Sequence, residues 1–139
     1  MFKKLVVGTD GSDSAERAVT HAATLAKEGA AQLVVVHAYP EARSDAPTTF
    51  GAADAYPAAE IGKAILEDVA KHHDEAKIKT VLGQGDAAEV LIDVADQENA
   101  DLIVVGNKGM TGAKRFVLGS VPNRISHHAP CSVLIVHTT

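Results

Sequence analysis

The chain has 139 residues, of which 46% are hydrophobic and 4% aromatic, and it carries a formal net charge of −5 at pH 7. This length suits one domain, residues 1–139, with a sizeable core, and the negative charge argues against a protein that binds nucleic acid. The apolar run near the N-terminus stops at Gly8, too early for a signal peptide or a membrane span, and the single cysteine suits a reducing compartment. We therefore expect a cytoplasmic protein without a membrane partner.

Short apolar runs alternate with longer amphipathic segments along the chain, a pattern typical of alternating strands and helices. In chain order we expect a strand at 4–8, a helix at 13–27, a strand at 32–39, a loop at 40–56, a helix at 57–73, a strand at 77–82, a helix at 86–98, a strand at 101–105, a helix at 120–128 and a strand at 132–136. The loop is longer than usual for a compact fold. It is either a disordered excursion at the surface or a flexible cover over the end of the strand at 32–39.

Particular side chains mark the starts of three of these helices. Asp13 with Glu16, and Asp86 with Glu89, have the spacing of capping boxes, in which a side chain before the helix accepts a hydrogen bond from its first turn. Pro57 suits the first turn of a helix, because the N–H that it lacks has no helical partner there.

Two of the expected strands contain runs of uninterrupted apolar residues, at 33–36 and 102–105, which indicates burial on both faces. A parallel sheet with helices on both faces buries strands in this way. We therefore predict a doubly wound, Rossmann-like α/β fold with five strands in the order 3-2-1-4-5. Ligands of such sheets bind at the carboxyl ends of the strands where the order reverses, which here lies between the first and the fourth strand.

The most informative motif follows the fourth strand and has the spacing Gly-x2-Gly-x9-Gly-Ser. Its members are Gly106, Gly109, Gly119 and Ser120. Glycine allows backbone N–H groups to approach an anion closely, and a side chain at Gly106 would block the floor of the crevice. The helix that starts after Gly119 adds free N–H groups and a favourable dipole, and Ser120 either caps this helix or bonds to a phosphate oxygen. The motif therefore predicts a site for a nucleotide phosphate.

The distribution of charge agrees with an anionic ligand near this motif. Residues 102–139 contain no Asp or Glu and have a formal charge of +4, whereas residues 1–101 have a formal charge of −9. The four cations of the second part are Lys108, Lys114, Arg115 and Arg124. Lys108 lies within the motif, and the other three either reach the phosphates or lie in solvent. A basic segment of this size suits one small polyanion better than a nucleic acid.

Thr9 and Asp10 follow the first strand and are expected to face the motif across the crevice. Because a carboxylate repels phosphate, Asp10 would accept hydrogen bonds from the amino group of adenine or the hydroxyls of ribose at the other end of the ligand. The alternative is a turn aspartate that bonds to the local backbone. Together the two segments predict a mononucleotide site.

Four segments resemble the universal stress protein family, specifically its ATP-binding branch. They are the opening Val6-Val7-Gly8-Thr9-Asp10-Gly11-Ser12, the strand end Val36-His37-Ala38, the motif at 106–120, and the closing Ala129-Pro130-Cys131-Ser132-Val133-Leu134-Ile135-Val136. The resemblance covers essentially the whole chain. It implies a five-stranded α/β fold, usually a homodimer, that binds ATP, alone or with Mg²⁺, and acts in stress response or regulation.

The resemblance also implies which residues hold ATP. Asp10, with Thr9 beside it, and Ala38 match positions that contact adenosine. The positions that match those around the ribose and phosphates are Gly106, Lys108, Gly109, Gly119, Ser120 and Val121. Ala38 is smaller than the valine common in the family, and Pro122 lacks an N–H, so we expect weaker affinity or a shifted preference among ATP, ADP and AMP.

The last strand, at 132–136, would form an apolar edge of the sheet, which is prone to aggregation unless it is covered. Pairing with the same strand of a second copy in a two-fold contact covers it. With the resemblance, this predicts a homodimer through the strand around Cys131–Val136. We expect Cys131 to be a buried small hydrophobic residue.

Two further functions stay open. The segment Thr9-Asp10-Gly11-Ser12-Asp13-Ser14 partly resembles the Ser-Gly-Gly-x-Asp-Ser loop of ATP pyrophosphatases, which would make the protein an enzyme that cleaves ATP. Asp10 replaces a glycine of that loop and would repel phosphate, and the sequence shows no pair of nucleophile and base, so we assign no catalytic and no metal-binding residue. The third function is a dimeric interaction module without nucleotide, against which the intact glycines count.

Overall fold

The strands and helices follow one another in the expected order. The computed structural model describes residues 1–40, 51–108 and 118–138, and only the backbone of residues 51–56. The strands are β1 (Lys4–Gly8), β2 (Gln32–Tyr39), β3 (Lys77–Gln84), β4 (Leu102–Gly106) and β5 (Ser132–Val136). The helices are α1 (Asp13–Glu28), α2 (Gly51–His72), α3 (Ala87–Gln97) and α4 (Ser120–His128).

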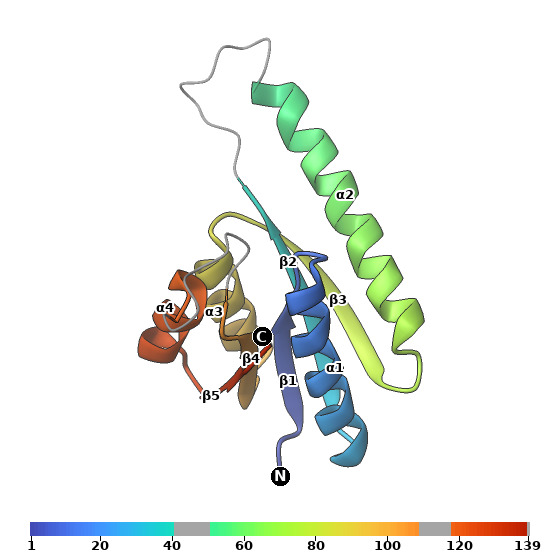
Figure 1. Cartoon of the computed structure of the whole chain (residues 1–139), viewed down its shortest axis with the longest axis vertical. Coiled ribbons are helices and arrows are strands. Elements are labelled where there is room, and N and C mark those ends of the chain that lie inside the picture. The colour runs from blue at the N-terminus through green and yellow to red at the C-terminus, as the bar shows by residue number, and fades with distance from the viewer. Residues whose placement is uncertain (41–50, 109–117, 139) are drawn as a thin grey trace.

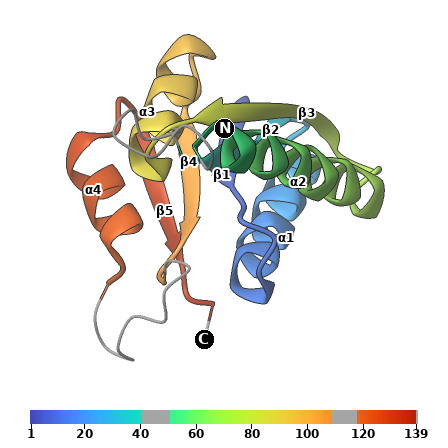
Figure 2. The same cartoon turned by 90° about the horizontal axis from the view of Figure 1, so that it is seen from above.

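The five strands are parallel and hydrogen-bonded in the order β3-β2-β1-β4-β5, so the predicted doubly wound fold is confirmed (Figure 1). Helices α1 and α2 cover one face of the sheet, and α3 and α4 cover the other (Figure 2). The strand order reverses between β1 and β4, which pair from Leu5↔Leu102 to Val7↔Val104. The carboxyl ends of these two strands therefore lie side by side, where ligands of such sheets bind.

The inner strands are buried on both faces because successive side chains point to opposite sides of a sheet. In β1, Leu5 and Val7 belong to the core cluster beneath α1 and α2, whereas Val6 belongs to the cluster beneath α3 and α4. In β4, Val104 and Ile103 divide in the same way. Each such side chain stabilises the fold by about 1.5–3 kcal/mol when fully buried, which explains why the strands read as continuous apolar runs.

The start of α1 differs by one residue from the predicted capping box. Ser12, rather than Asp13, is the N-cap, and its hydroxyl oxygen accepts a hydrogen bond from the N–H of Ala15 at 3.2 Å. Gly11 adopts a positive φ of 82° directly before it, in the turn out of β1, and the helix itself begins at Asp13 as predicted. Asp13 lies in the first helical turn instead, where its charge interacts favourably with the helix dipole.

The second helix begins earlier than expected. Because α2 starts at Gly51, Pro57 lies inside the helix, where a proline costs about 3 kcal/mol. The predicted loop at 40–56 is therefore wrong for residues 51–56, and residues 41–50 lie outside the described part of the chain. Residues 51–56 contain three alanines, which favour a helix, but they lack the apolar periodicity by which a helix is recognised in a sequence.

Strand β3 extends beyond its expected end to Gln84, because it pairs with β2 up to Tyr39↔Gln84. The N–H of Gly85 then donates to the carbonyl of Tyr39 at 2.8 Å and closes the turn before α3.

Among the helices that the structure describes, none is both long enough and apolar enough to cross a membrane.

Candidate functional site

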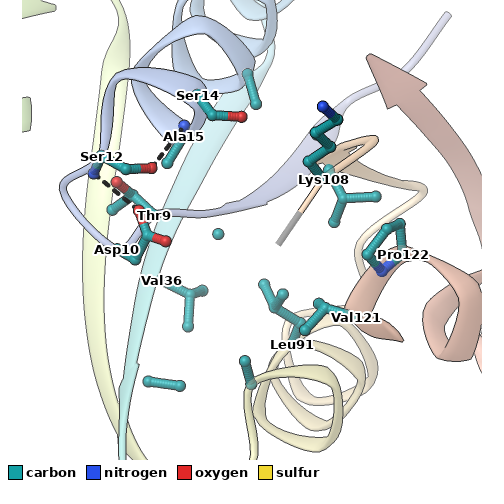
Figure 3. A pocket seen from close by; sticks show the side chains of 16 residues that line it. Thr9, Asp10, Ser12, Ser14, Ala15, Val36, Leu91, Lys108, Val121 and Pro122 are labelled. Atoms are coloured by element: carbon teal, nitrogen blue, oxygen red, sulfur yellow. Dashed lines mark hydrogen bonds between the residues drawn. The ribbon is translucent and has the colours of Figure 1, made fainter. Parts of the chain in front are cut away.

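A pocket opens at the carboxyl ends of β1 and β4, where the strand order reverses. Residues of β1, β2 and β4 line it from the sheet, and residues of α1, α3 and α4 line it from both layers of helices (Figure 3). The sequence segments that follow β1 and β4 therefore meet at one site, as the sequence analysis expects.

The floor of the pocket is apolar. Val36 and Ala38 reach it from β2, and Leu91 reaches it from α3. Leu91 comes close because Gly8 has no side chain: a Cβ at Gly8 would lie 2.9 Å from Cδ1 of Leu91. A floor of this kind, between a sheet and a helix, suits a flat aromatic ring such as a nucleobase.

The turn after β1 is held by local hydrogen bonds. The carboxylate of Asp10 accepts one from the N–H of Ser12 at 2.8 Å, and the hydroxyl of Thr9 accepts one from the N–H of Gly11 at 3.1 Å. A ring nitrogen of buried His37 lies 2.9 Å from the carbonyl oxygen of Thr9 and supports the turn from below. Asp10 is thus a turn aspartate through one carboxylate oxygen, and it also lines the pocket (Figure 3).

The opposite wall carries a positive charge. Among the described lining residues, Lys108 is the cation and Asp10 is the anion, and Figure 3 shows them on opposite sides of the pocket. Val121 and Pro122, in the first turn of α4, line the pocket as well, and Figure 3 shows Pro122 on the same side as Lys108. The pocket therefore has an acidic end, an apolar floor and a basic end.

The start of α4 lacks a side-chain cap among the described residues. Gly119 is the N-cap and Ser120 the first helical residue, and no side chain of the described residues caps the helix. Of the two roles considered for Ser120, that of the helix cap is wrong, because Ser120 lies inside the helix. Its bond to a phosphate oxygen stays a prediction. Since Pro122 has no N–H, the free donors of this turn belong to the residues before it.

Most of the residues expected from the sequence meet at the pocket. Those that line it are Thr9, Asp10, Ala38, Gly106, Lys108 and Val121. Gly119 and Ser120 precede Val121 and are not among the described lining residues. Gly109, Lys114 and Arg115 lie outside the described part of the chain.

The absent side chain of Gly106 has a role beyond the expected one. A Cβ there would lie 3.2 Å from Cγ2 of Thr138, which is a buried residue. The glycine therefore makes room for Thr138 at the end of β4, a contact that no local pattern reveals. Gly106 also lines the pocket, and the prediction that a side chain there would block the crevice floor stays a prediction.

Arg124 pairs with α3 and is not among the described lining residues. Its guanidinium contacts Asp86 at 2.8 Å and Glu89 at 3.3 Å. Asp86 is the N-cap of α3, as predicted, and its carboxylate accepts a hydrogen bond from the N–H of Glu89 at 3.2 Å. Because all three side chains are largely exposed, these ion pairs contribute at most about 1 kcal/mol each.

Helix α1 supplies pocket residues that were not expected from the sequence. Ser12, Ser14 and Ala15 line the pocket from the start of α1. Their position in the sequence could have predicted this, because the helix after the first strand of a doubly wound sheet starts at the edge where ligands bind. Leu91 has no such signal, since its place depends on how α3 packs against the sheet.

Of the residues shared with the ATP pyrophosphatase loop, Asp13 lies outside the set of described lining residues and Ser14 belongs to it. Asp13 is exposed and is not among the described lining residues, whereas Ser14 lines the pocket with its hydroxyl 2.6 Å from that of Thr138. The partial match in sequence therefore does not place its acidic residue at the pocket.

Cys131 lies directly before β5 and is partly buried, not fully buried as expected. Burial raises the pKa of its thiol above the ordinary value, with a further contribution from the charge of Asp101. The thiol is therefore protonated at neutral pH, which makes it a poor nucleophile.

The chain matches the model of the universal stress protein family over residues 1–137. The universal stress protein Rv1636 of Mycobacterium tuberculosis is 40% identical over 151 aligned positions, which span 99% of this chain and 98% of that protein. A crystal structure of a universal stress protein in complex with cAMP is 36% identical, covers 99% of both chains and superposes with a TM-score of 0.76. The structure of the protein MJ0577 is 26% identical, covers 100% of this chain and 98% of its own, and has a TM-score of 0.88.

Proposed function

The chain belongs to the universal stress protein family, and from this premise we propose that it is a regulatory protein whose single domain binds an adenine nucleotide, ATP in the first place, in the pocket between β1 and β4. The observation that carries the proposal is the order of chemical groups along the pocket. An acidic residue lies at one end, an apolar floor in the middle, and a cation at the other end, beside a helix start that no described side chain caps.

This order matches the parts of an adenine nucleotide. The base would lie on the floor formed by Val36, Ala38 and Leu91, and the second carboxylate oxygen of Asp10 would accept from the adenine amino group or the ribose hydroxyls. The phosphates would lie toward Lys108 and the start of α4, where free N–H groups and the helix dipole favour an anion.

The relative that binds cAMP supports an adenine nucleotide as the ligand class, at 36% identity over nearly the whole chain. cAMP carries one negative charge and ATP about four, so the basic end of the pocket favours ATP, whereas the small number of cations among the described lining residues leaves cAMP as a competitor. Comparison of the two nucleotides is therefore part of the test.

The proposal is tested by isothermal titration calorimetry with ATP, ADP, AMP and cAMP. Ala38→Phe places a ring on the floor where the base would lie, and we expect affinity to fall by roughly 100-fold or more because the displaced base loses its buried contacts. Ala64→Phe, at an exposed position of α2, is the matched control and leaves the affinity unchanged. A wild-type protein that binds none of these nucleotides, or equal binding by Ala38→Phe, contradicts the proposal.

We further propose that the protein is a homodimer joined through β5. This strand pairs with β4 on one side and forms an edge of the sheet. Leu134 is 37% and Ile135 36% exposed, so the edge presents apolar side chains, and within the described part of the chain no strand pairs with its outer side. A two-fold contact with a second copy of β5 covers both.

A further inference from the structure

Asn107 joins three elements beside the pocket without being among the described lining residues. It lies between Gly106 and Lys108, which do line the pocket. Its N–H donates to the carbonyl of Val136 at the end of β5 at 2.8 Å, and its own carbonyl accepts from the N–H of Gly119 at 3.0 Å. One residue therefore ties the ends of β4 and β5 to the start of α4.

The side chain of Asn107 holds the segment that follows β5. Its Oδ1 accepts hydrogen bonds from the N–H of Thr138 at 2.8 Å and from the hydroxyl of Thr138 at 3.0 Å. Its Nδ2 lies 3.2 Å from Nδ1 of His137. Thr138 is only 2% exposed, so its polar groups have left water and depend on these partners.

Thr138 also contacts α1, across the pocket from Lys108. Its hydroxyl oxygen lies 2.6 Å from that of Ser14, and its carbonyl accepts a hydrogen bond from Arg17 at 2.5 Å. A hydroxyl has a single proton, and that of Thr138 is donated to Asn107, so Ser14 is the donor to Thr138. The hydrogen bonds thus run in one direction, from the wall formed by α1 to the wall formed by the end of β4.

We propose that Asn107 and Thr138 form a latch that sets the distance between these two walls, and that both are positioning residues for the nucleotide site. Ser14 belongs to one wall and Lys108 to the other, and the buried hydroxyl of Thr138 joins them. Without that hydroxyl, its two hydrogen bonds to Ser14 and Asn107 are lost and only those of the Thr138 backbone remain, so the turn that carries Lys108 is held less firmly relative to α1. The inference rests on the proposed function, because it concerns the affinity of the same pocket.

The latch also connects the pocket with β5. Because coupling between two events is reciprocal, docking of Thr138 strengthens nucleotide binding, and bound nucleotide stabilises the docked segment after β5. The hydrogen bond from the N–H of Asn107 to the carbonyl of Val136 therefore links the turn beside the pocket to β5, whose edge carries the exposed Leu134 and Ile135.

The first test is the affinity for ATP, measured by calorimetry in two variants of Thr138. Thr138→Val keeps the volume and removes the hydroxyl, and we expect about tenfold weaker binding. Thr138→Ser removes the methyl group and keeps the hydroxyl, and we expect affinity within about twofold of wild type. A residue that matters only through packing gives the opposite order. Thr24→Val, which removes an exposed hydroxyl from α1, is the matched control.

The second test needs no nucleotide. Amide hydrogen exchange measured by NMR reports the bond between Gly119 and Asn107, and we expect Thr138→Val to accelerate exchange of the Gly119 N–H about tenfold, while Thr138→Ser and Thr24→Val leave it unchanged. If Thr138→Val does not fold, Ser14→Ala interrupts the same chain of hydrogen bonds and is measured in both tests.

The outcomes separate the latch from the proposed function. Wild-type affinity for ATP in Thr138→Val, with the wild type binding normally, overturns the latch and leaves the function standing. If the wild type binds no nucleotide, the function fails, and the exchange rate of Gly119 then decides alone: an unchanged rate overturns the latch, and an accelerated rate supports it.

Discussion

Asp10 and Lys108 place opposite charges at the two ends of the pocket, and this separation is the residue-scale basis of the proposed specificity. Asp10 uses one carboxylate oxygen to hold its own turn, and in the proposed complex the other oxygen would accept a hydrogen bond from the nucleotide. Lys108 directly follows Asn107, whose hydrogen bonds hold the chain at that point. A flexible side chain is thus presented from a well-anchored backbone.

Lys108→Gln tests the charge directly. We expect ATP to bind roughly tenfold more weakly, because a charge-assisted hydrogen bond contributes about 1.5–3 kcal/mol and part of that is screened at a half-exposed position. cAMP, with a single charge, should lose less than about threefold. Calorimetry with both nucleotides gives the ratio, and Lys71→Gln at the end of α2 is the control with the same change in net charge. Equal losses for both ligands would contradict the placement of the phosphates.

At the scale of elements, the layer of α3 and α4 forms one side of the pocket. The two helices pack together, and Arg124 of α4 pairs with the N-cap residue Asp86 of α3. Leu91 reaches the floor from α3, and Val121 reaches the basic end from α4. The relative position of these helices therefore decides the shape of the site.

Asp86 has two roles that substitutions separate. Asp86→Asn keeps a good N-cap and removes the ion pair with Arg124, so we expect the free energy of unfolding to change by less than about 0.5 kcal/mol. Asp86→Ala removes both and should cost about 1 kcal/mol. Urea unfolding of the two variants gives the difference, with Asp93→Ala at an exposed position of α3 as the control. A loss of similar size in both variants would show that the ion pair, not the cap, is the larger contribution.

At the scale of the whole molecule, the doubly wound sheet provides both the site and the proposed dimer contact. The pocket lies at the reversal of strand order between β1 and β4, and the exposed edge of β5 is one strand further along. A ligand that changes the end of β4 therefore acts close to the surface through which two copies would meet.

The double substitution Leu134→Lys with Ile135→Lys tests the dimer. Like charges that face each other across a two-fold strand pair repel, so we expect this variant to sediment as a monomer while the wild type sediments as a dimer. Leu25→Lys, at a 37% exposed leucine of α1, keeps the dimer if β5 is the contact. A monomeric wild type, or a double variant that remains dimeric in analytical ultracentrifugation, contradicts the proposal.

The fold was predictable from the sequence because its signals are local. Runs such as 102–105 are apolar at every position since both faces of a central strand are covered, and this is visible without knowing what covers them. The prediction failed at the start of α2, where the preference of proline for a first helical turn competes with the helix preference of the residues before it. Pro57 usually marks a first turn, but an alanine-rich stretch before it continues the helix to Gly51.

The sequence by itself determined the doubly wound sheet, the edge at which the pocket lies and a set of residues most of which line it, because apolar runs, glycines, charges and turn residues at strand ends act through their immediate neighbours. Only the tertiary structure decided that Arg124 pairs with α3, that α1 and Leu91 complete the pocket, and that Gly106 makes room for Thr138. These contacts join residues far apart in the chain, and their geometry is set by how the helices pack on the sheet, which no local pattern encodes.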